Sequence, residues 1–302
     1  MAKNEQILVV GADSFLGEKL IQILENQHRH VIGTTRRKET LSNNRVYLDL
    51  FDDDLNFKLP EGTTYAYLLA GIVNYGECAN NPRAWEVNVE KMTRLAALLF
   101  EQGVFVTFIS TNTVFGGELP WCNEDDPHTP EFPYSKHKSA AEFSIREVAK
   151  KLGTLDLFNI VRLTKILGIN TSPLPDWFSR LTLAKEINPF SDLIIAPMSL
   201  RFTAESLAEI GRSRLVGNFH LSGSKNINYV DLAMAFVNAL GYKEALVKPT
   251  TATDMKVDIP FKPTFSGIGM ERTTELTGIK PQDLNSVVVD VITEYEDSKN
   301  SM

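Results

Sequence analysis

Three side chains near the middle of the sequence have the chemistry to pass a proton to a carbonyl group. Tyr134 and Lys138 lie four positions apart, and an apolar run that ends in Thr111 precedes them. A free tyrosine has a pKa of about 10, so its hydroxyl is a protonated donor at neutral pH. A nearby ammonium favours the phenolate that remains, and a threonine hydroxyl can donate to the same substrate oxygen. A Tyr and a Lys at this spacing are also common on solvated helices, so the order of the three residues after a glycine loop is what favours catalysis.

That glycine loop opens the chain. Gly11 directly follows the apolar run Ile7–Val10, and Gly17 comes six residues later. Glycine permits the tight turn from strand to helix and a close approach of that helix to the sheet, and the helix N-terminus can then hold the pyrophosphate of a dinucleotide. A plain turn is the alternative, because a serine replaces the middle glycine of the usual pattern. The position at the start of a βαβ unit favours a cradle, and its predicted residues are Gly11, Asp13, Ser14, Phe15, Leu16 and Gly17.

The end of the next predicted strand indicates which dinucleotide binds. There the chain reads Thr34-Thr35-Arg36-Arg37, where an acid would bind the ribose hydroxyls of NAD and an arginine the extra phosphate of NADP. A guanidinium matches phosphate oxygens in a bidentate way, so we predict NADP(H), with NAD(H) and a solvated charge cluster as alternatives. Asp49 is predicted to reach the adenine and Leu50 to be a further cofactor-binding residue, although an aspartate at a strand end also forms turns. Together with Thr111, Tyr134 and Lys138, called the Tyr134 group below, a nicotinamide cofactor indicates hydride chemistry.

The apolar pattern predicts the scaffold that positions these residues. Short β-branched runs alternate with longer amphipathic segments over residues 7–10, 18–26, 30–35, 65–70, 81–102 and 104–110. This is the rhythm of βαβ units. Apolar residues occupy both faces of the run Phe105–Ile109, which implies helices on both sides of the sheet. With a helix from Tyr134 to about Leu152 and a strand over 155–163, we predict an α/β fold, a Rossmann-type doubly wound parallel sheet.

The second half of the chain has a different texture. From Gly168 onward, prolines are spread through irregular segments between short helical patches. We predict a dinucleotide-binding Rossmann domain over residues 1–165 and, over 166–302, mostly a smaller C-terminal substrate-binding lobe. The chain is predicted to return to the sheet once, at about 215–224, through Gly217–Leu221.

The composition of the chain indicates which classes of partner to expect and which to exclude. Acidic residues number 38 against 31 basic ones, the formal charge is -7, and there is no basic run, so we expect no nucleic-acid partner. Cys78 and Cys122 have neither metal-site spacing nor the count of a disulfide framework, which indicates a reducing compartment and hence the cytoplasm. No apolar run has the length of a signal peptide core or a bilayer, so no membrane association is expected. The five histidines lack metal-ligand spacing, so no metal is expected, and His137 is predicted to lie on a helix surface.

These motifs resemble those of the extended short-chain dehydrogenase/reductases, the NAD-dependent epimerase/dehydratase superfamily, and in particular the branch that contains dTDP-4-dehydrorhamnose reductase. The similar segments span nearly the whole chain: Ile109–Gly117, Glu124–Pro127 with Pro130, Tyr134–Glu142, Ile160–Leu163 and Gly217–Gly223. The resemblance implies catalysis by Thr111, Tyr134 and Lys138. It also implies a cofactor site of Gly11, Gly17, Arg36, Arg37, Ala70 and Gly71, with Tyr134 and Lys138 contacting the cofactor as well.

The resemblance implies a reaction but leaves the sugar open. Asn112 stands where the reductase branch has aspartate, and Asn112-Thr113 cannot supply the acids with which related dehydratases eliminate water. We expect reduction of a keto group on a nucleotide-activated deoxysugar. A nucleotide-sugar epimerase of the same superfamily and a non-catalytic NADP-binding regulatory subunit are the alternatives. A homodimer built on a pair of helices is common in the superfamily.

An acidic protein that binds an anionic sugar nucleotide must gather cations locally. Trp177 and Arg180, which follow Asn170, could stack on a base and pair with a diphosphate, although plain core packing is the alternative for the tryptophan. Arg201 is a candidate on charge alone. The predicted substrate residues are therefore Asn112, Asn170, Trp177, Arg180 and Arg201.

Overall fold

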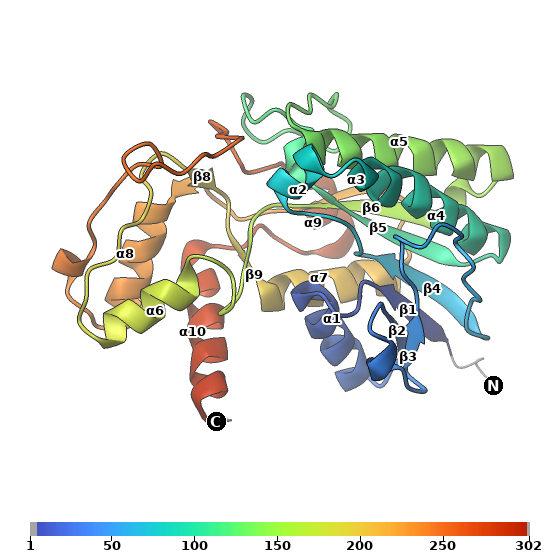
Figure 1. Ribbon diagram of the computed structural model, residues 1–302, viewed down its shortest axis with the longest axis horizontal. Helices are drawn as coiled ribbons and strands as arrows, with labels where there is room; N and C mark the ends of the chain where they lie inside the picture. Colours follow the sequence, from blue (N-terminus) through green and yellow to red (C-terminus); the bar gives the residue numbers. More distant parts are fainter. Residues whose placement is uncertain (1–4, 301–302) are drawn as a thin grey trace. The chain divides into compact units, whose positions relative to one another are not determined.

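The computed structural model describes residues 5–300 and contains a seven-stranded sheet in the order β10-β6-β5-β4-β1-β2-β3 (Figure 1). The pairs β1–β2, β1–β4, β2–β3 and β4–β5 are parallel. The strands are β1 (Gln6–Val10), β2 (His30–Thr35), β3 (Arg45–Tyr47), β4 (Thr63–Leu68), β5 (Phe105–Thr111), β6 (Phe158–Leu163) and β10 (Gly217–Leu221). The predicted Rossmann-type parallel sheet is confirmed, and the segment at Gly217–Leu221 is one of its strands.

Helices cover both faces of this sheet (Figure 1). On one face lie α1 (Phe15–Asn26) and α7 (Leu200–Ser213), and on the other lie α2 (Tyr75–Asn80), α3 (Arg83–Trp85), α4 (Met92–Glu101) and α5 (Pro133–Leu152). The helix predicted over 81–102 is divided, because a π-helical stretch, Glu86–Lys91, lies between α3 and α4. This wider turn buries the polar side chains of Asn88 and Lys91 together with their apolar neighbours.

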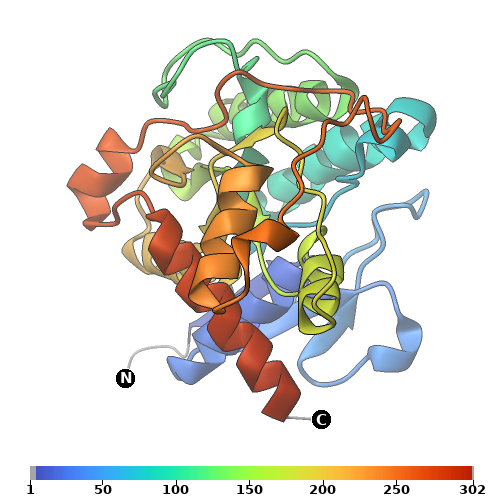
Figure 2. The same cartoon turned by 90° about the vertical axis from the view of Figure 1, so that its left-hand side faces the viewer.

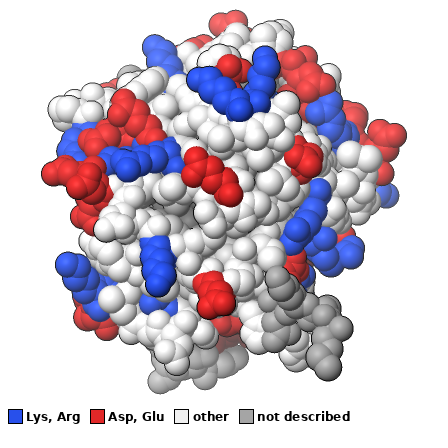
Figure 3. Space-filling view, turned by 90° about the vertical axis from the view of Figure 1, so that its right-hand side faces the viewer, with Lys and Arg blue, Asp and Glu red and all other residues white. Residues whose placement is uncertain are grey.

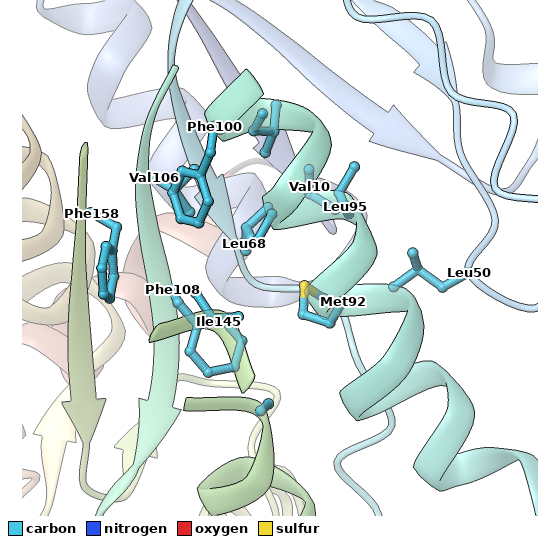
Figure 4. Packing of buried hydrophobic residues seen from close by; sticks show 14 of the residues in the cluster. Val10, Leu50, Leu68, Met92, Leu95, Phe100, Val106, Phe108, Ile145 and Phe158 are labelled. Carbon is cyan, nitrogen blue, oxygen red and sulfur yellow. The ribbon is translucent and has the colours of Figure 1, made fainter. Parts of the chain in front are cut away.

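The core between the sheet and the α4–α5 layer is apolar (Figure 4). All seven residues of β5 are buried, as expected for a central strand with cover on both faces. The cluster combines strand residues with residues from α4 and α5, and it includes Val10, Leu68, Met92, Leu95, Phe100, Val106, Phe108, Ile145 and Phe158. This packing fixes the strands up to the carboxyl-terminal edge of the sheet, where the polar residues that follow them lie.

The chain forms two compact units. The first comprises residues up to Val114, His128–Arg162 and Ala204–Phe219, and the second comprises Phe115–Pro127, Leu163–Thr203 and the residues from His220 onward. Figure 2 shows α6 (Leu174–Thr182), α8 (Tyr229–Ala239) and α10 (Leu284–Asn300), which belong to the second unit. Their apolar faces form a separate core around Trp177, Phe178 and Phe236.

The remaining elements are short. They are β7 (Ile166–Leu167), β8 (Ile194–Ile195), β9 (Met198–Ser199), β11 (Ile227–Asn228), α9 (Glu271–Thr277) and 3-10 turns at Lys38–Thr40, Asn112–Val114, Leu155–Leu157 and Glu244–Leu246. Cys78 and Cys122 are buried free thiols.

The surface carries both signs of charge. On the face shown in Figure 3, Lys and Arg groups are interspersed with Asp and Glu groups. Among residues 5–300, no helix has both the length and the apolar character that crossing a membrane requires. The same part of the chain contains no cluster of three or more His, Cys, Asp or Glu side chains able to hold a metal ion.

Candidate active site and dinucleotide cradle

The loop after β1 is built around glycines that no other residue can replace without movement. Gly11 has a φ of +90°, and a Cβ placed on it would lie 2.7 Å from the Ala70 nitrogen. A Cβ on Gly17 would overlap the Gly11 carbonyl oxygen. The loop therefore lies directly against the chain that follows β4, with the N-terminus of α1 behind it. This close backbone approach is the geometry that a pyrophosphate cradle requires.

Ser14 caps the first helix instead of crowding the loop. Its hydroxyl accepts a hydrogen bond from the Gly17 N–H at 3.1 Å and donates to the Gly11 carbonyl at 2.8 Å. The side chain of Leu16 is buried and that of Phe15 is 45% exposed. The first N–H groups of a helix have no partner within the helix, so the amides of Phe15 and Leu16 are the natural anion donors.

The two arginines after β2 have different surroundings. Arg37 pairs with Asp13 through Nε–Oδ2 and Nη2–Oδ1 distances of 3.3 and 3.2 Å, and the Thr35 hydroxyl donates to Asp13 at 2.6 Å. Burial opposes ionisation of Asp13, but these hydrogen bonds hold its pKa below the usual range. Arg36 is exposed, with its guanidinium carbon 5.9 Å from the centre of the Phe51 ring. Of the two predicted phosphate ligands, Arg36 is therefore the less engaged within the protein.

Arg45 is a cationic neighbour of the cradle that sequence reasoning missed. A Cβ on Gly33 would overlap the Arg45 guanidinium and would lie 2.5 Å from the Ala12 Cβ. Arg45 therefore crosses β2 above Gly33, and its charge contributes to the lowered pKa of Asp13. A glycine in the interior of a strand marks such close approaches, and Gly33 was the available signal.

The other predicted cofactor residues lie at the same sheet edge. Asp49 accepts a hydrogen bond from the Phe51 N–H at 2.9 Å, so it forms the turn that was the alternative to an adenine contact. The Leu50 side chain belongs to the core. The Ala70 N–H donates to the Val10 carbonyl at 3.1 Å, and Gly71 is exposed. Their contacts with a cofactor stay predictions.

The structure brings Thr111, Tyr134 and Lys138 together between β5 and α5. Thr111 is the last residue of β5, and Pro133 begins α5, where the Ser135 hydroxyl accepts from the Phe132 N–H at 3.2 Å. The Lys138 Nζ donates to the Ile109 carbonyl at 2.7 Å, and the Tyr134 hydroxyl is in hydrogen-bonding relation to Thr111. Both Thr111 and Lys138 are 7% exposed.

Burial dominates the protonation of the pair. It raises the pKa of Tyr134, Tyr75 and Cys78 add to this effect, and the hydrogen bond with Thr111 partly offsets it. Burial lowers the pKa of Lys138 to about 8, against the opposing influence of Glu142 and Cys78. The net shift of the Tyr134 pKa is upward, opposite to the depression expected from a neighbouring lysine, because burial is the largest influence on this hydroxyl. Tyr134 is therefore a protonated donor at neutral pH.

Several residues around the tyrosine were not predicted. The Tyr75 ring stacks on the Tyr134 ring with centroids 5.6 Å apart. Asn88 accepts from the Ile72 N–H at 2.7 Å and donates to the Ile72 carbonyl at 2.9 Å, which fixes the chain beyond Gly71. The prediction that His137 lies on a helix surface is wrong. It is 7% exposed, because α5 turns this position toward Asn88 and the edge of Trp85.

The predicted substrate residues fall in both units. Asn112 follows Thr111, whose hydroxyl donates to its Oδ1 at 3.3 Å. In the second unit, Trp177 is 3% exposed and belongs to the apolar core, which favours the packing alternative. Arg180 donates to the Glu186 carbonyl at 2.6 Å, and Asn170 and Arg201 are exposed. Their roles toward a substrate stay predictions.

Curated relatives match most of the chain at low identity. A probable low-salt glycan biosynthesis reductase, Agl14 of Haloferax volcanii, is 23% identical over 258 residues, which cover 82% of this chain and 84% of that protein. The methionine adenosyltransferase 2 subunit beta of Bos taurus is also 23% identical, over 264 residues that cover 82% of this chain and 76% of that protein.

Solved structures share the fold. A dTDP-4-dehydrorhamnose reductase from Clostridium acetobutylicum superposes with a TM-score of 0.80 at 21% identity, covering 96% of this chain and 99% of that one. The Bacillus anthracis reductase of the same name, in complex with NADP, gives 0.79 at 16% identity, with 97% and 99% covered. A UDP-glucose 4-epimerase from Thermus thermophilus, in complex with NAD, gives 0.75 at 18% identity, with 95% and 98% covered.

A family profile described as the RmlD substrate binding domain matches residues 5–297. This range includes the glycine loop, the Tyr134 group and nearly all of the second unit. The resemblance inferred from the motifs is thereby confirmed, and the chain belongs to the RmlD substrate binding domain family.

Proposed function

We propose that this chain is an NADP(H)-dependent reductase of a keto group on a nucleotide-activated deoxysugar. The observation that carries the proposal is the meeting of Thr111, Tyr134 and Lys138 at the carboxyl end of β5. β1, β4 and β5 are neighbouring parallel strands, so the glycine loop, Ala70-Gly71 and Thr111 lie at one edge of the sheet. Ligands of open α/β sheets bind at this edge.

The cradle fits a dinucleotide. A Cβ at Gly11 or Gly17 would overlap neighbouring backbone, so the glycines permit the tight loop, and the amides of Phe15 and Leu16 at its end would hold the pyrophosphate. Arg36 would bind the ribose phosphate, with Arg37 and Arg45 adding positive charge around Asp13. When bound, NADPH supplies the hydride.

The protein's own groups handle the proton. Tyr134 donates its hydroxyl proton to the keto oxygen, and the Thr111 hydroxyl donates a hydrogen bond to the same oxygen. Lys138, in its ammonium form, stabilises the phenolate that Tyr134 becomes. Buried surroundings strengthen each of these electrostatic effects. The similarity to the Haloferax and Clostridium proteins, both named as reductases, supports this assignment.

Consumption of NADPH with a panel of 4-keto sugar nucleotides tests the proposal. The wild-type chain should oxidise NADPH with at least one member of the panel, and Tyr134→Phe should lower turnover by about 100-fold or more. Tyr242→Phe, an equally conservative change in the second unit, is the matched control and should leave turnover intact. Wild-type turnover in Tyr134→Phe would overturn the assigned proton donor.

Two other functions have support. The similarity to a UDP-glucose 4-epimerase favours an epimerase, which would interconvert sugar nucleotides without net consumption of NADPH. The similarity to a methionine adenosyltransferase subunit favours a regulatory subunit, which would bind NADPH without turning over any member of the panel. The retained Thr111, Tyr134 and Lys138 favour the reductase.

The remaining expectations concern the setting of the protein. We propose that it acts in the cytoplasm, because its buried cysteines are unpaired, as is usual in a reducing compartment. A homodimer stays a prediction, to be tested by light scattering of the purified chain.

A further inference from the structure

A buried ion pair lies behind the catalytic group. Glu142 and Arg162 are 3% and 2% exposed. The Arg162 Nη2 donates to the Glu142 Oε2 at 2.7 Å, and its Nε lies 3.1 and 3.2 Å from the two carboxylate oxygens. A buried pair of this kind is maintained only by close geometry and further hydrogen bonds, and such a pair often contributes little to stability. We therefore looked for a role of the Glu142–Arg162 pair in positioning the catalytic side chains.

The Glu142 carboxylate is connected both to Lys138 on α5 and to the end of β5 that carries Thr111. Glu142 lies one helical turn beyond Lys138 on α5, so the two side chains share a face of the helix. The Ser110 hydroxyl donates to the Glu142 Oε1 at 2.5 Å, and Ser110 immediately precedes Thr111. Lys138 itself donates to the Ile109 carbonyl. The end of β5 is thus held to α5 at two successive residues, one bound by Lys138 and the other by Glu142.

His128 contacts the Arg162 side of this ion pair. Its Nε2 lies 2.9 Å from the Arg162 Nη2, and its Nδ1 lies 2.8 Å from the Ser139 hydroxyl. Burial lowers the pKa of His128, so it is neutral at pH 7 and accepts from the guanidinium. Arg162 is therefore fixed from two directions, and it fixes the Glu142 carboxylate in turn.

We propose that Glu142 is a positioning residue that acts through Lys138 and Ser110, keeping the lysine charged and holding the threonine end of β5 against α5. The catalytic consequence of this role rests on the proposed reductase function. The effect on the charge of Lys138 does not, and it can be measured without a substrate.

The groups that face Lys138 single out Glu142. On its own helix, Tyr134 lies one turn before Lys138 and Glu142 one turn after it. Cys78 faces it from α2, and the Ile109 carbonyl and the Phe108 ring face it from β5. Burial raises the pKa of both Tyr134 and Cys78, so neither is charged at neutral pH. Ser110, His128 and Arg162 face Glu142 from the other side. Glu142 is thus the negative charge that offsets the burial of the ammonium.

The first test is an NMR titration of the full-length chain with isotope-labelled lysine, in which Lys138→Met identifies the signal. The wild-type ammonium should titrate at about 8. Glu142→Gln should lower this pKa, and Glu147→Gln, which removes a charge elsewhere on the same helix, should not. An unchanged Lys138 pKa in Glu142→Gln overturns the proposal. If that variant does not fold, Glu142→Asp, which keeps a carboxylate for Arg162 but on a side chain shorter by one methylene, is titrated instead; a lowered Lys138 pKa supports the proposal and an unchanged one overturns it.

The second readout is the pH profile of NADPH oxidation. In Glu142→Gln the alkaline limb should move to lower pH, so that the loss of kcat is about tenfold greater on the alkaline side for each unit of pKa shift. A purely structural role would lower kcat equally at all pH values, and that result contradicts the proposal. If the wild-type chain reduces no substrate, the proposed function fails, while the NMR titration still decides the role of Glu142.

Discussion

Gly11→Ala is the substitution whose cost the structure specifies most closely. A Cβ at this position would lie 2.7 Å from the Ala70 nitrogen and 2.9 Å from its Cα, where ordinary contact begins at 3.4 Å. The loop or the chain after β4 must therefore move by about 0.7 Å, the difference between the contact limit and the shorter distance. Both obstructing atoms belong to the backbone, so no side-chain rotation relieves the overlap. The left-handed φ adds about 1–2 kcal/mol, and overpacking adds about 1–3 kcal/mol.

Gly103→Ala is the matched control, because Gly103 has a φ of +69° but nothing within 4 Å of its added Cβ. Both alanine variants carry the backbone strain, so their difference isolates the overlap of about 1–3 kcal/mol. Thermal unfolding should place Gly11→Ala about 2–12 °C below Gly103→Ala. Calorimetric titration with NADPH should show weaker binding only in Gly11→Ala, since the displaced loop is the proposed cradle. Equal melting temperatures and equal affinities would refute the close approach of the loop to the chain after β4.

Three further predictions concern charge. Arg36→Ala should weaken the binding of NADPH by about 10–100-fold and that of NADH by less than about threefold, because only NADPH carries the phosphate that this guanidinium is proposed to bind. The double variant with Arg37→Ala should show the same selectivity. Equal losses of affinity for both cofactors would argue against binding of the phosphate by these arginines. Turnover should fall as the pH rises through about 8, where the buried Lys138 loses its proton, and a profile that stays flat to pH 10 would contradict the need for an ammonium group. Arg162→Met should lower the free energy of unfolding by about 3–5 kcal/mol, since it leaves Glu142 buried without its partner. Urea denaturation of Glu142→Gln/Arg162→Met should recover most of that loss, and identical midpoints for the single and double variants would show that the two residues do not act as a pair.

The strands were predictable where burial and β-branched residues coincide. The strand expected over 30–35 matches β2, and the apolar run Phe105–Ile109 lies within β5. The strand expected from 155 begins only at Phe158, because Leu155–Leu157 form a 3-10 turn in which Leu155 is 44% exposed. Apolar content is the same on both sides of that boundary, so periodicity alone could not locate it.

The residues of the proposed site could be predicted from the sequence, but most of their contact partners could not. The order of the glycine loop, Thr111 and the Tyr134–Lys138 pair is visible in the sequence, because each follows a strand or begins a helix. The partners are not visible, since they are brought together by packing between distant segments. Arg37 with Asp13, Arg45 above Gly33, and Tyr75 against Tyr134 all depend on contacts that no local pattern encodes.

In the proposed reaction, a hydride passes to a keto carbon while Tyr134 supplies the proton. Turnover of a 4-keto sugar nucleotide with NADPH deuterated at the nicotinamide C4, followed by mass spectrometry of the sugar, tests this claim most directly. The reduced sugar should carry the deuterium from one face of the nicotinamide, and Tyr134→Phe should form almost none of this labelled product. A product without deuterium would rule out hydride transfer to the sugar, and labelled product formed by Tyr134→Phe at the wild-type rate would rule out Tyr134 as the proton donor.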